Sequence, residues 1–287
     1  MAVALFLSPH LDDAVLACAG RMQRHIARGD TVVVTTVFSH AASPHDATWA
    51  ARRREDETAT ARLGATARWL GLLDAPFRDP HYRDFETLTG PTTTRDAVSV
   101  DRLRETLHAH EHALRPAVVH VPLAVGDHVD HQLVHAAADV LDARCLYYED
   151  QPYAAVRHAV ARRRAELGYT TDEVDRPPPA AEYVDAMLRA PYVRAFLPPG
   201  PARQRCERRW DRWPTATQST PVSAEVERLD STMAARAEHA IFAYDSQVRA
   251  LFGSRESYRA MMSEHARAVG QPAPRAERYW HRPRAGR

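Results

Sequence analysis

A histidine and two adjacent acids directly follow the first apolar run of the chain. In "FLSPHLDD", His10, Asp12 and Asp13 come after the β-branched and apolar stretch at 3–8. Two neighbouring carboxylates repel each other, so a metal, a substrate or solvent must neutralise them. His10 and Asp13 are three residues apart at an expected strand-to-helix turn, so both can face one point. Imidazole and carboxylate are the ligands of catalytic divalent metals, which keep one position open for water.

A second stretch could complete such a site from a distant part of the chain. "GDHVDHQLVH" (126–135) places His128 and His131 three residues apart, just after the apolar run at 117–123. If both runs are strands of one doubly wound sheet, the ends of the first and fourth strands lie close together, at the edge where ligands bind. Two such pairs at neighbouring strand ends predict one shared metal site.

Both stretches resemble the motifs of a known enzyme family. "SPHLDDAVLACAG" is similar to the PHxDDxxLxxGG signature of the LmbE-like, or PIG-L-type, zinc N-deacetylases, and "HVDH" resembles the second HxDH element of that family. "RRREDETATARLGA", "YYEDQPY" and "AIFAYDSQV" also agree, so the resemblance runs from residue 3 to about 253. "CAG" (18–20) replaces a more usual glycine pair, which affects the packing of the first helix and no ligand.

The resemblance implies a role for each residue of the two motifs. It makes His10, Asp13 and His131 the metal ligands. The expected metal is Zn²⁺, with Fe²⁺ or another divalent cation as the alternative. Asp12 matches the general base of the family. His128 matches the residue that stabilises the oxyanion or protonates the leaving amine.

Further residues are expected to support this centre. Asp130 should orient an imidazole as a hydrogen-bond acceptor behind the metal. Arg52 and Arg53 are expected to bind substrate hydroxyls, because the family places an arginine there; a solvated charged helix face is the alternative. Glu149 ends the fifth expected strand at the same crevice, where it or Asp150 binds substrate or caps the next turn.

Each motif also has a purely structural interpretation. Acids at a helix N-terminus commonly cap the helix and complement its dipole, and two histidines near a helix start are often surface residues. The occurrence of both motifs in the right order favours the metal site. The histidines of "HAHEH" (108–112) fall on a helical face without a convergent acid, so no second metal is expected there.

The predicted activity is zinc-dependent amide hydrolysis. Its simplest form is N-deacetylation of an N-acylated amino sugar or sugar-containing metabolite in a thiol or natural-product pathway, so the partner is a small N-acylated molecule. A thiol-conjugate amidase is a variant within the family. From another class, a non-catalytic metal-stabilised binding module would fill all four metal positions with protein. A nucleotide-cofactor enzyme is disfavoured, because acids rather than a glycine-rich turn follow the first strand.

Alternating strand and helix patterns must position these residues. β-Branched runs predict strands at 3–8, 31–38, 66–72, 117–123 and 144–150, and helical periodicity predicts helices at 13–28, 51–65, 99–114, 129–143, 231–251 and 254–268. This alternation is typical of an α/β fold with a doubly wound, mostly parallel, Rossmann-like sheet.

The same pattern divides the chain into three parts. Residues 1–152 are expected to form the α/β core with the metal site. Residues 153–220, with proline-rich runs at 175–183 and 196–204, are expected to form an irregular lobe that covers the crevice; a surface insertion is the alternative. Residues 221–287 are expected to form a C-terminal helical segment that packs on the core.

Bulk composition excludes several classes of partner. The chain has 287 residues, of which 26% are charged, and its formal net charge of +1 offers no footprint for nucleic acid. No stretch has the pattern of a signal peptide or a membrane span. The widely separated Cys18, Cys145 and Cys206 argue against disulfides and for the cytoplasm. A homo-oligomer is compatible with this composition.

Overall fold

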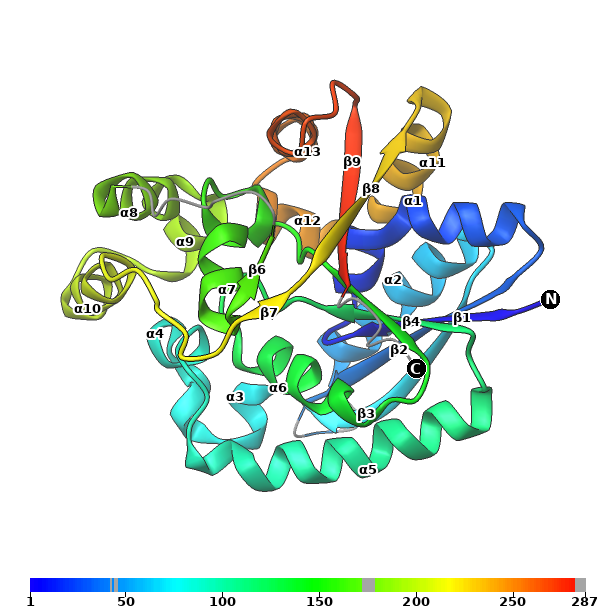
Figure 1. Cartoon of the computed structure of the whole chain (residues 1–287), viewed down its shortest axis with the longest axis horizontal. Coiled ribbons are helices and arrows are strands. Elements are labelled where there is room, and N and C mark those ends of the chain that lie inside the picture. Colours follow the sequence, from blue (N-terminus) through cyan, green and yellow to red (C-terminus); the bar gives the residue numbers. More distant parts are fainter. Residues whose placement is uncertain (42, 44–45, 172–178, 282–287) are drawn as a thin grey trace.

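A seven-stranded sheet forms the centre of the fold, with the strand order β3-β2-β1-β4-β5-β9-β8 (Figure 1). The computed structural model describes residues 1–41, 43, 46–171 and 179–281. The first five strands run parallel, whereas β9 is antiparallel to β5 and β8 is antiparallel to β9. The strands are β1 (Val3–Ser8), β2 (Thr31–His40), β3 (Thr66–Leu73), β4 (Val118–Pro122), β5 (Arg144–Tyr148), β8 (Ser223–Leu229) and β9 (Arg275–His281).

Helices cover both faces of this sheet. One face carries α5 (Ala97–Leu114) and α6 (Val129–Ala137), and in Figure 1 α5 runs along the lower edge of the molecule. The other face carries α1 (Asp13–Ala27), α2 (Ala47–Leu63), α11 (Ser231–Ile241), α12 (Asp245–Phe252) and α13 (Arg255–Ala268). Two short helices, α3 (Ala75–Arg78) and α4 (Phe85–Leu88), follow β3.

Alternating residues of β1 explain why its sequence is apolar throughout. Leu5 and Leu7 pack into the core under α5 and α6, whereas Ala4 and Phe6 pack into the core under α1. Because successive side chains of a strand point to opposite faces, a strand covered on both sides must be apolar at every position. The prediction of a doubly wound, mostly parallel sheet is confirmed.

The helix limits follow local capping signals. The side chain of Asp46 accepts hydrogen bonds from the backbone N–H groups of Thr48 and Trp49 at the start of α2, and Gly64 ends that helix in the left-handed region at φ 78°. The helix expected at 129–143 is shorter, since α6 ends at Ala137 and the 3₁₀ turn η3 (Ala138–Val140) follows. The helix expected at 231–251 is divided into α11 and α12.

The C-terminal segment is not purely helical, which corrects the prediction for 221–287. It contains α11, α12 and α13 as expected, but it also supplies β8 and β9. These strands, "SAEVERL" and "RAERYWH", mix charged and aromatic residues, so their sequences lack the β-branched pattern of the parallel strands. They are strands because β9 pairs with the edge of β5, which is a contact with a remote part of the chain.

The lobe at 153–220 is more regular than its prolines suggest. It contains the 3₁₀ turn η4 (Tyr153–Ala155), the helices α7 (Ala159–Leu167), α8 (Ala180–Arg189), α9 (Pro191–Phe196) and α10 (Pro201–Trp210), and the short strands β6 (Tyr169–Thr170) and β7 (Thr220–Pro221). Residues 175–178 of the first proline-rich run lie outside the described residues. In Figure 1, α8, α9 and α10 lie at the left, beyond α7.

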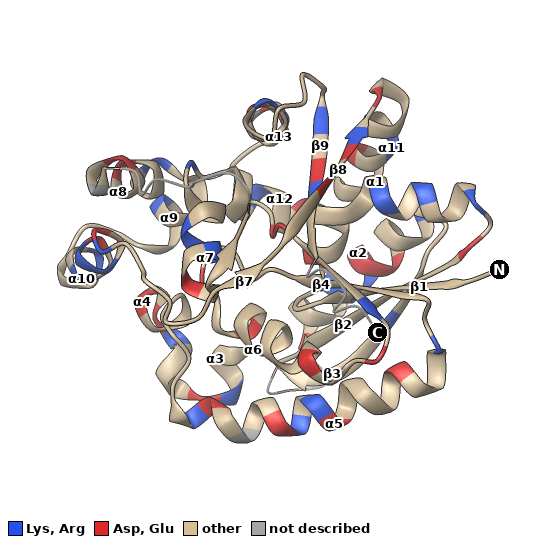
Figure 2. Ribbon diagram, in the orientation of Figure 1, with Lys and Arg blue, Asp and Glu red and all other residues tan. Residues whose placement is uncertain are grey.

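Acidic and basic residues both occur on the helices. Figure 2 shows acidic and basic positions interspersed along α5 and α10, in agreement with the formal net charge of +1. Among the described residues, no helix combines the length and the apolar character needed to cross a membrane.

Gly168, which joins α7 to β6, provides a test of the lobe. Its φ is +65°, and a Cβ atom there would lie 2.0 Å from the backbone oxygen of Gln218. Gly168→Ala should therefore lower the free energy of unfolding by about 1–3 kcal/mol through overpacking alone, in addition to backbone strain. Gly270→Ala is the matched control, because its φ is +76° but nothing lies within 4 Å of the new atom. Equal losses in denaturant titrations of the two variants would contradict the close approach at Gly168.

Candidate functional site

A turn between β1 and α1 positions the first motif. The hydroxyl of Ser8 donates to the carbonyl of His10 (2.6 Å) and accepts from the backbone N–H of Ala14 (2.9 Å). The backbone N–H of His10 donates to Oδ2 of Asp13 (2.8 Å). These bonds close the turn, so that His10 and the two acids are buried at the carboxyl end of β1.

A second turn, between β4 and α6, positions the histidines of the second motif. His128 caps α6, since its Nδ1 accepts a hydrogen bond from the backbone N–H of Asp130 (3.2 Å). Gly126 has a φ of +90°, and a Cβ atom there would lie 2.5 Å from the ring of Tyr153. The close approach of this turn to Tyr153 therefore requires glycine. Because β1 and β4 are parallel neighbours, both turns lie at the same edge of the sheet.

The two motifs converge on the carboxylate of Asp13. Its Oδ2 lies 3.3 Å from Nδ1 of His10 and 3.3 Å from Nε2 of His131. The imidazoles of His10, His128 and His131 each bring one nitrogen within 4.8 Å of the others. The structure thus brings together the four residues that the sequence placed around one point, and this group could hold a divalent metal.

Two further acids contact the outer nitrogens of these histidines. Nε2 of His10 donates to Oδ2 of Asp130 (3.1 Å), and Nδ1 of His131 donates to Oδ1 of Asp150 (2.7 Å). Each imidazole therefore turns its remaining nitrogen, with its lone pair when the ring is neutral, toward Asp13. Nε2 of His131 is buried and has no hydrogen-bond partner among the described residues. Three electron-pair donors directed at one point are the arrangement that a cation satisfies.

The supporting acids are themselves held by neighbouring elements. Asp130 also accepts from the backbone N–H of Ala75 (3.0 Å) and from Nη2 of Arg78 (2.6 Å), both in α3. Asp150 also accepts from the backbone N–H of Val125 (2.9 Å), in the turn before α6. Both carboxylates are fully buried, so these bonds fix the orientation of the imidazoles behind the cluster.

Charges within the cluster shift the pKa values of its members. Burial would lower the pKa of His131, but Asp13 and Asp150 raise it to about 9. Burial opposes protonation of His10 too, yet the charge of Asp74 and hydrogen bonds to Asp13 and Asp130 raise its pKa well above the usual value. Burial favours the neutral form of Asp13, but His131 and His10 hold its pKa well below the usual range. Without a cation, protons on the imidazoles therefore provide the positive charge.

Asp12 and His128 differ from these residues in their surroundings. Burial and the charge of Asp13 raise the pKa of Asp12 to about 8, against the opposing charges of Arg52 and His10. Burial and the charges of His10 and His131 lower the pKa of His128 well below its usual value. Asp12 therefore binds a proton more tightly than an ordinary aspartate does. The lowered pKa of His128 keeps its imidazole neutral.

The two arginines expected to bind substrate occupy different places on α2. The guanidinium of Arg52 lies over the ring of Trp49 (4.8 Å), and its charge acts on Asp12. Nη1 of Arg53 donates to the carbonyl of Ser39 (3.2 Å), which ties α2 to the end of β2. Arg52 is thus near the cluster, whereas Arg53 is engaged by backbone.

Glu149, the other residue expected to bind substrate, lies apart from the cluster. Its Oε1 accepts from Nε of Arg278 (2.5 Å) and from Nε1 of Trp280 (2.8 Å), both in β9. Its Oε2 faces His265 at 3.4 Å. The carboxylate therefore joins β5 to the C-terminal elements.

Sequence reasoning left three participating residues without a defined role. The sequence left open whether Glu149 or Asp150 faces the crevice, and in the structure Asp150 reaches His131, whereas Glu149 contacts β9. Asp74, whose Oδ1 lies 3.7 Å from Nε2 of His10, and Arg78 were not considered. Asp74 directly follows β3, so the rule that ligands bind at the carboxyl ends of parallel strands could have found it.

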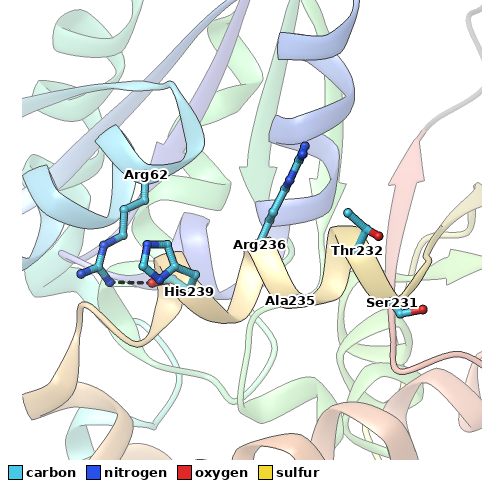
Figure 3. A pocket seen from close by; sticks show the side chains of 6 residues that line it. All are labelled: Arg62, Ser231, Thr232, Ala235, Arg236 and His239. Carbon is cyan, nitrogen blue, oxygen red and sulfur yellow. Dashed lines mark hydrogen bonds between the residues drawn. The ribbon is translucent and has the colours of Figure 1, made fainter.

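Two surface cavities lie away from the cluster. One of about 490 Å³ lies along α11 and faces the end of α2, where Arg62 donates to the carbonyl of His239 (Figure 3). This bond satisfies a carbonyl in the last turn of α11, so Arg62 has a structural explanation. A second cavity, of about 640 Å³, lies between α7 and α13. Neither is lined by a residue of the cluster.

Part of the chain is similar in sequence to known proteins. The family described as PIG-L: GlcNAc-PI de-N-acetylase matches residues 5–141, which include both motifs. The chain is 35% identical over 180 residues to 2'-N-acetylparomamine deacetylase of Streptomyces fradiae, over 54% of this chain and 59% of that protein. It is 27% identical over 185 residues to a protein of the same name from Niallia circulans, over 52% and 66% of the two chains. The chain thus spans about three fifths of the length of the first of these curated relatives.

Solved structures share the fold over the whole chain. The crystal structure of the zinc inhibited form of teicoplanin deacetylase Orf2 superposes with a TM-score of 0.67 and 21% identity, and the match covers 99% of this chain and 100% of that chain. At this identity the likeness establishes the arrangement of sheet and helices.

The adjacent acids Glu149 and Asp150 should respond differently to loss of charge. Glu149→Gln leaves Arg278 without its buried counter-charge, so it should lower the free energy of unfolding by about 1–3 kcal/mol and keep metal affinity unchanged. Asp150→Asn removes the negative charge behind His131 and replaces one of the two oxygens that accept from His131 and Val125 with a donor, so it should weaken metal affinity about 10–100-fold. Denaturant unfolding and metal titration of both variants separate the effects. Normal metal affinity in Asp150→Asn would argue against its orienting role.

Proposed function

We propose that this chain belongs to the PIG-L family, whose model matches residues 5–141, and that it is a metal-dependent amidohydrolase that removes an acyl group from the nitrogen of an amino sugar or a sugar-containing metabolite. The observation that carries the proposal is the convergence of His10 and His131 on Asp13, with two contacts of 3.3 Å. The names of the two curated relatives, both deacetylases of an N-acetylated compound, support N-deacetylation in a natural-product pathway.

The residues around Asp13 fit a zinc ion. His10, Asp13 and His131 would hold it, since two neutral imidazoles and one carboxylate are donors typical of catalytic zinc, and Fe²⁺ accepts the same set. The buried, unpartnered Nε2 of His131 is the structural sign of such a ligand. When bound, zinc acts as a Lewis acid toward the substrate carbonyl and lowers the pKa of water to roughly 7.

Asp12 is placed to act as the general base. It is next to Asp13 but contributes to none of the contacts around that carboxylate, so it is available to the attacking water. Its raised pKa, about 8, increases its affinity for the proton that the water loses as its oxygen attacks the amide carbon. The C–N bond then breaks, the amine nitrogen takes a proton, and a free carboxylic acid and a free amine result.

His128 is placed to donate a hydrogen bond to the oxyanion. Its Nδ1 accepts from the backbone N–H of Asp130, so a neutral imidazole must carry its proton on Nε2. This N–H would stabilise the negative charge that develops on the carbonyl oxygen. The cap of α6 thereby sets the tautomer, and His128 is proposed to work as a neutral donor.

The lobe at 153–220 is proposed to form one wall of the substrate crevice. The ring of Tyr153 lies edge-on to His131 (5.7 Å between centroids), and the ring of Tyr192 in α9 packs edge-on to Tyr153 (5.0 Å). Arg52, whose charge acts on Asp12, is proposed to bind substrate hydroxyls. A thiol-conjugate amidase would use the same chemistry with a bulkier acyl group against this lobe.

A non-catalytic metal-stabilised binding module is the second candidate. The observation that favours it is the third imidazole, because a nitrogen of His128 lies within 4.8 Å of those of His10 and His131. If His128 filled a fourth metal position, no site would remain for water. The wide separation of the three cysteines in the sequence supports a reducing cytoplasm for either function. A homo-oligomer stays a prediction.

Variants of the cluster test the proposed activity by metal content and amine release. Wild type should bind zinc and release amine from some member of a panel of N-acetylated sugars. Asp12→Asn should keep the metal and lose about 10²–10⁴-fold in kcat. His131→Ala should lose the metal, whereas His135→Gln, one turn later on α6, should keep it.

His128→Ala separates the two candidate functions. An amidohydrolase should keep its metal and lose about 10²–10³-fold in kcat, because only an oxyanion donor is removed. A binding module should lose metal affinity in this variant and should show no turnover in wild type. A folded wild type without affinity for metal, or an Asp12→Asn variant as active as wild type, would overturn the proposed activity.

A further inference from the structure

A second group of potential metal ligands lies on the outer side of α5. His108 and His112 are one helical turn apart, and their ring centroids are 4.3 Å from each other. Asp142, in the loop after η3, brings its Oδ2 to 3.7 Å from Nε2 of His112. One ligand atom from each of the three side chains lies within 4.8 Å of the other two. The sequence indicated no acid that converges with these histidines, and the structure supplies Asp142, 30 residues after His112.

The loop that carries Asp142 is fixed to the same helix. The side chain of Glu111, which is buried, accepts hydrogen bonds from the backbone N–H groups of Asp142 (3.1 Å) and Ala143 (2.8 Å). Arg104, two turns earlier on α5, pairs with Asp139 through two bonds of 3.0 and 2.6 Å. Asp142 is therefore held beside His108 and His112 by contacts that do not involve the two histidines.

We propose that His108, His112 and Asp142 bind a divalent transition metal ion, at a site separate from the cluster at the carboxyl ends of the strands. Two histidines spaced i, i+4 present their nitrogens on one face of a helix, which is a known basis of zinc binding. A nearby carboxylate adds a third donor, and water fills the remaining positions. In the general order of metal affinities, a site with these donors binds Cu²⁺ more tightly than Zn²⁺.

The location defines what this metal can do. Asp142 lies two residues before β5, and α5 leads into β4, so the site lies at the amino ends of strands whose carboxyl ends carry the other cluster. A metal there cannot touch the substrate of the proposed reaction, but it would cross-link α5 to the loop before β5. The side chains of His112 and Asp142 are 62% and 81% exposed, so their ordering costs affinity, and binding should be roughly tenfold or more weaker than at the buried cluster.

Counting bound metal tests the proposal independently of any enzymatic activity. The full chain is stripped with a chelator, titrated calorimetrically with zinc chloride alone, and analysed for bound zinc. Wild type should bind two zinc ions of different affinity. The double variant His108→Ala/His112→Ala should bind one, with the higher affinity, and His10→Ala should keep the weaker one. His239→Ala is the control for the variants at His10, His108 and His112. It replaces an exposed histidine of α11, so it should keep both zinc ions.

Two outcomes would overturn the proposal. One is a wild type whose only zinc ion is lost in His10→Ala; the other is a double variant that binds as many zinc ions as wild type. Because the double variant alters only surface side chains of α5, it should retain the wild-type unfolding midpoint in the absence of metal, which shows that the fold is intact. Failure of amide hydrolysis would leave the expected metal counts unchanged, so the two proposals can fail separately.

Discussion

Three electron-pair donors are directed at one buried point: Nδ1 of His10, Nε2 of His131 and Oδ2 of Asp13. Such donors repel one another unless positive charge lies between them, and the rest of the site keeps them from turning away. Asp130 and Asp150 occupy the outer nitrogens, so neither imidazole can rotate without losing a hydrogen bond to a buried carboxylate. Parallel pairing of β1 with β4 and of β4 with β5 brings these residues to one edge.

This constraint extends into elements that carry no ligand. Asp130 accepts bonds from α3, and Asp150 accepts one from the turn before α6, so both segments are tied to the imidazoles. The turn before α6 leaves space for the ring of Tyr153 only because residue 126 is glycine, which has no Cβ atom. The position of the lobe therefore depends on the same bonds that orient the ligands. A change in the lobe can reach the cluster through Tyr153 without altering any ligand.

The part of the structure that could be predicted is the part that local pattern determines. Runs of apolar residues in β1, β2 and β4 reflect burial on both faces, and the spacing of His10, Asp13, His128 and His131 reflects two equivalent turns. β8 and β9 could not be predicted, because pairing with β5 and with each other outweighs their charged sequences. The choice between Glu149 and Asp150 depends on which face of the sheet each side chain enters, and a shift of one residue reverses it. Asp142 lies beside His108 and His112 only because the chain turns back toward α5 after η3.

The order of synthesis matters for Glu149. Its carboxylate is buried against Trp280, which lies 131 residues farther along the chain. At roughly 5–20 residues per second, a ribosome needs on the order of ten seconds to make that interval. During this time β5 is an open sheet edge, and the acid at its end has no partner from β9. The nascent core therefore passes through a stage with an exposed strand edge, which a chaperone or a neighbouring chain could bind, and completion of β9 ends that stage.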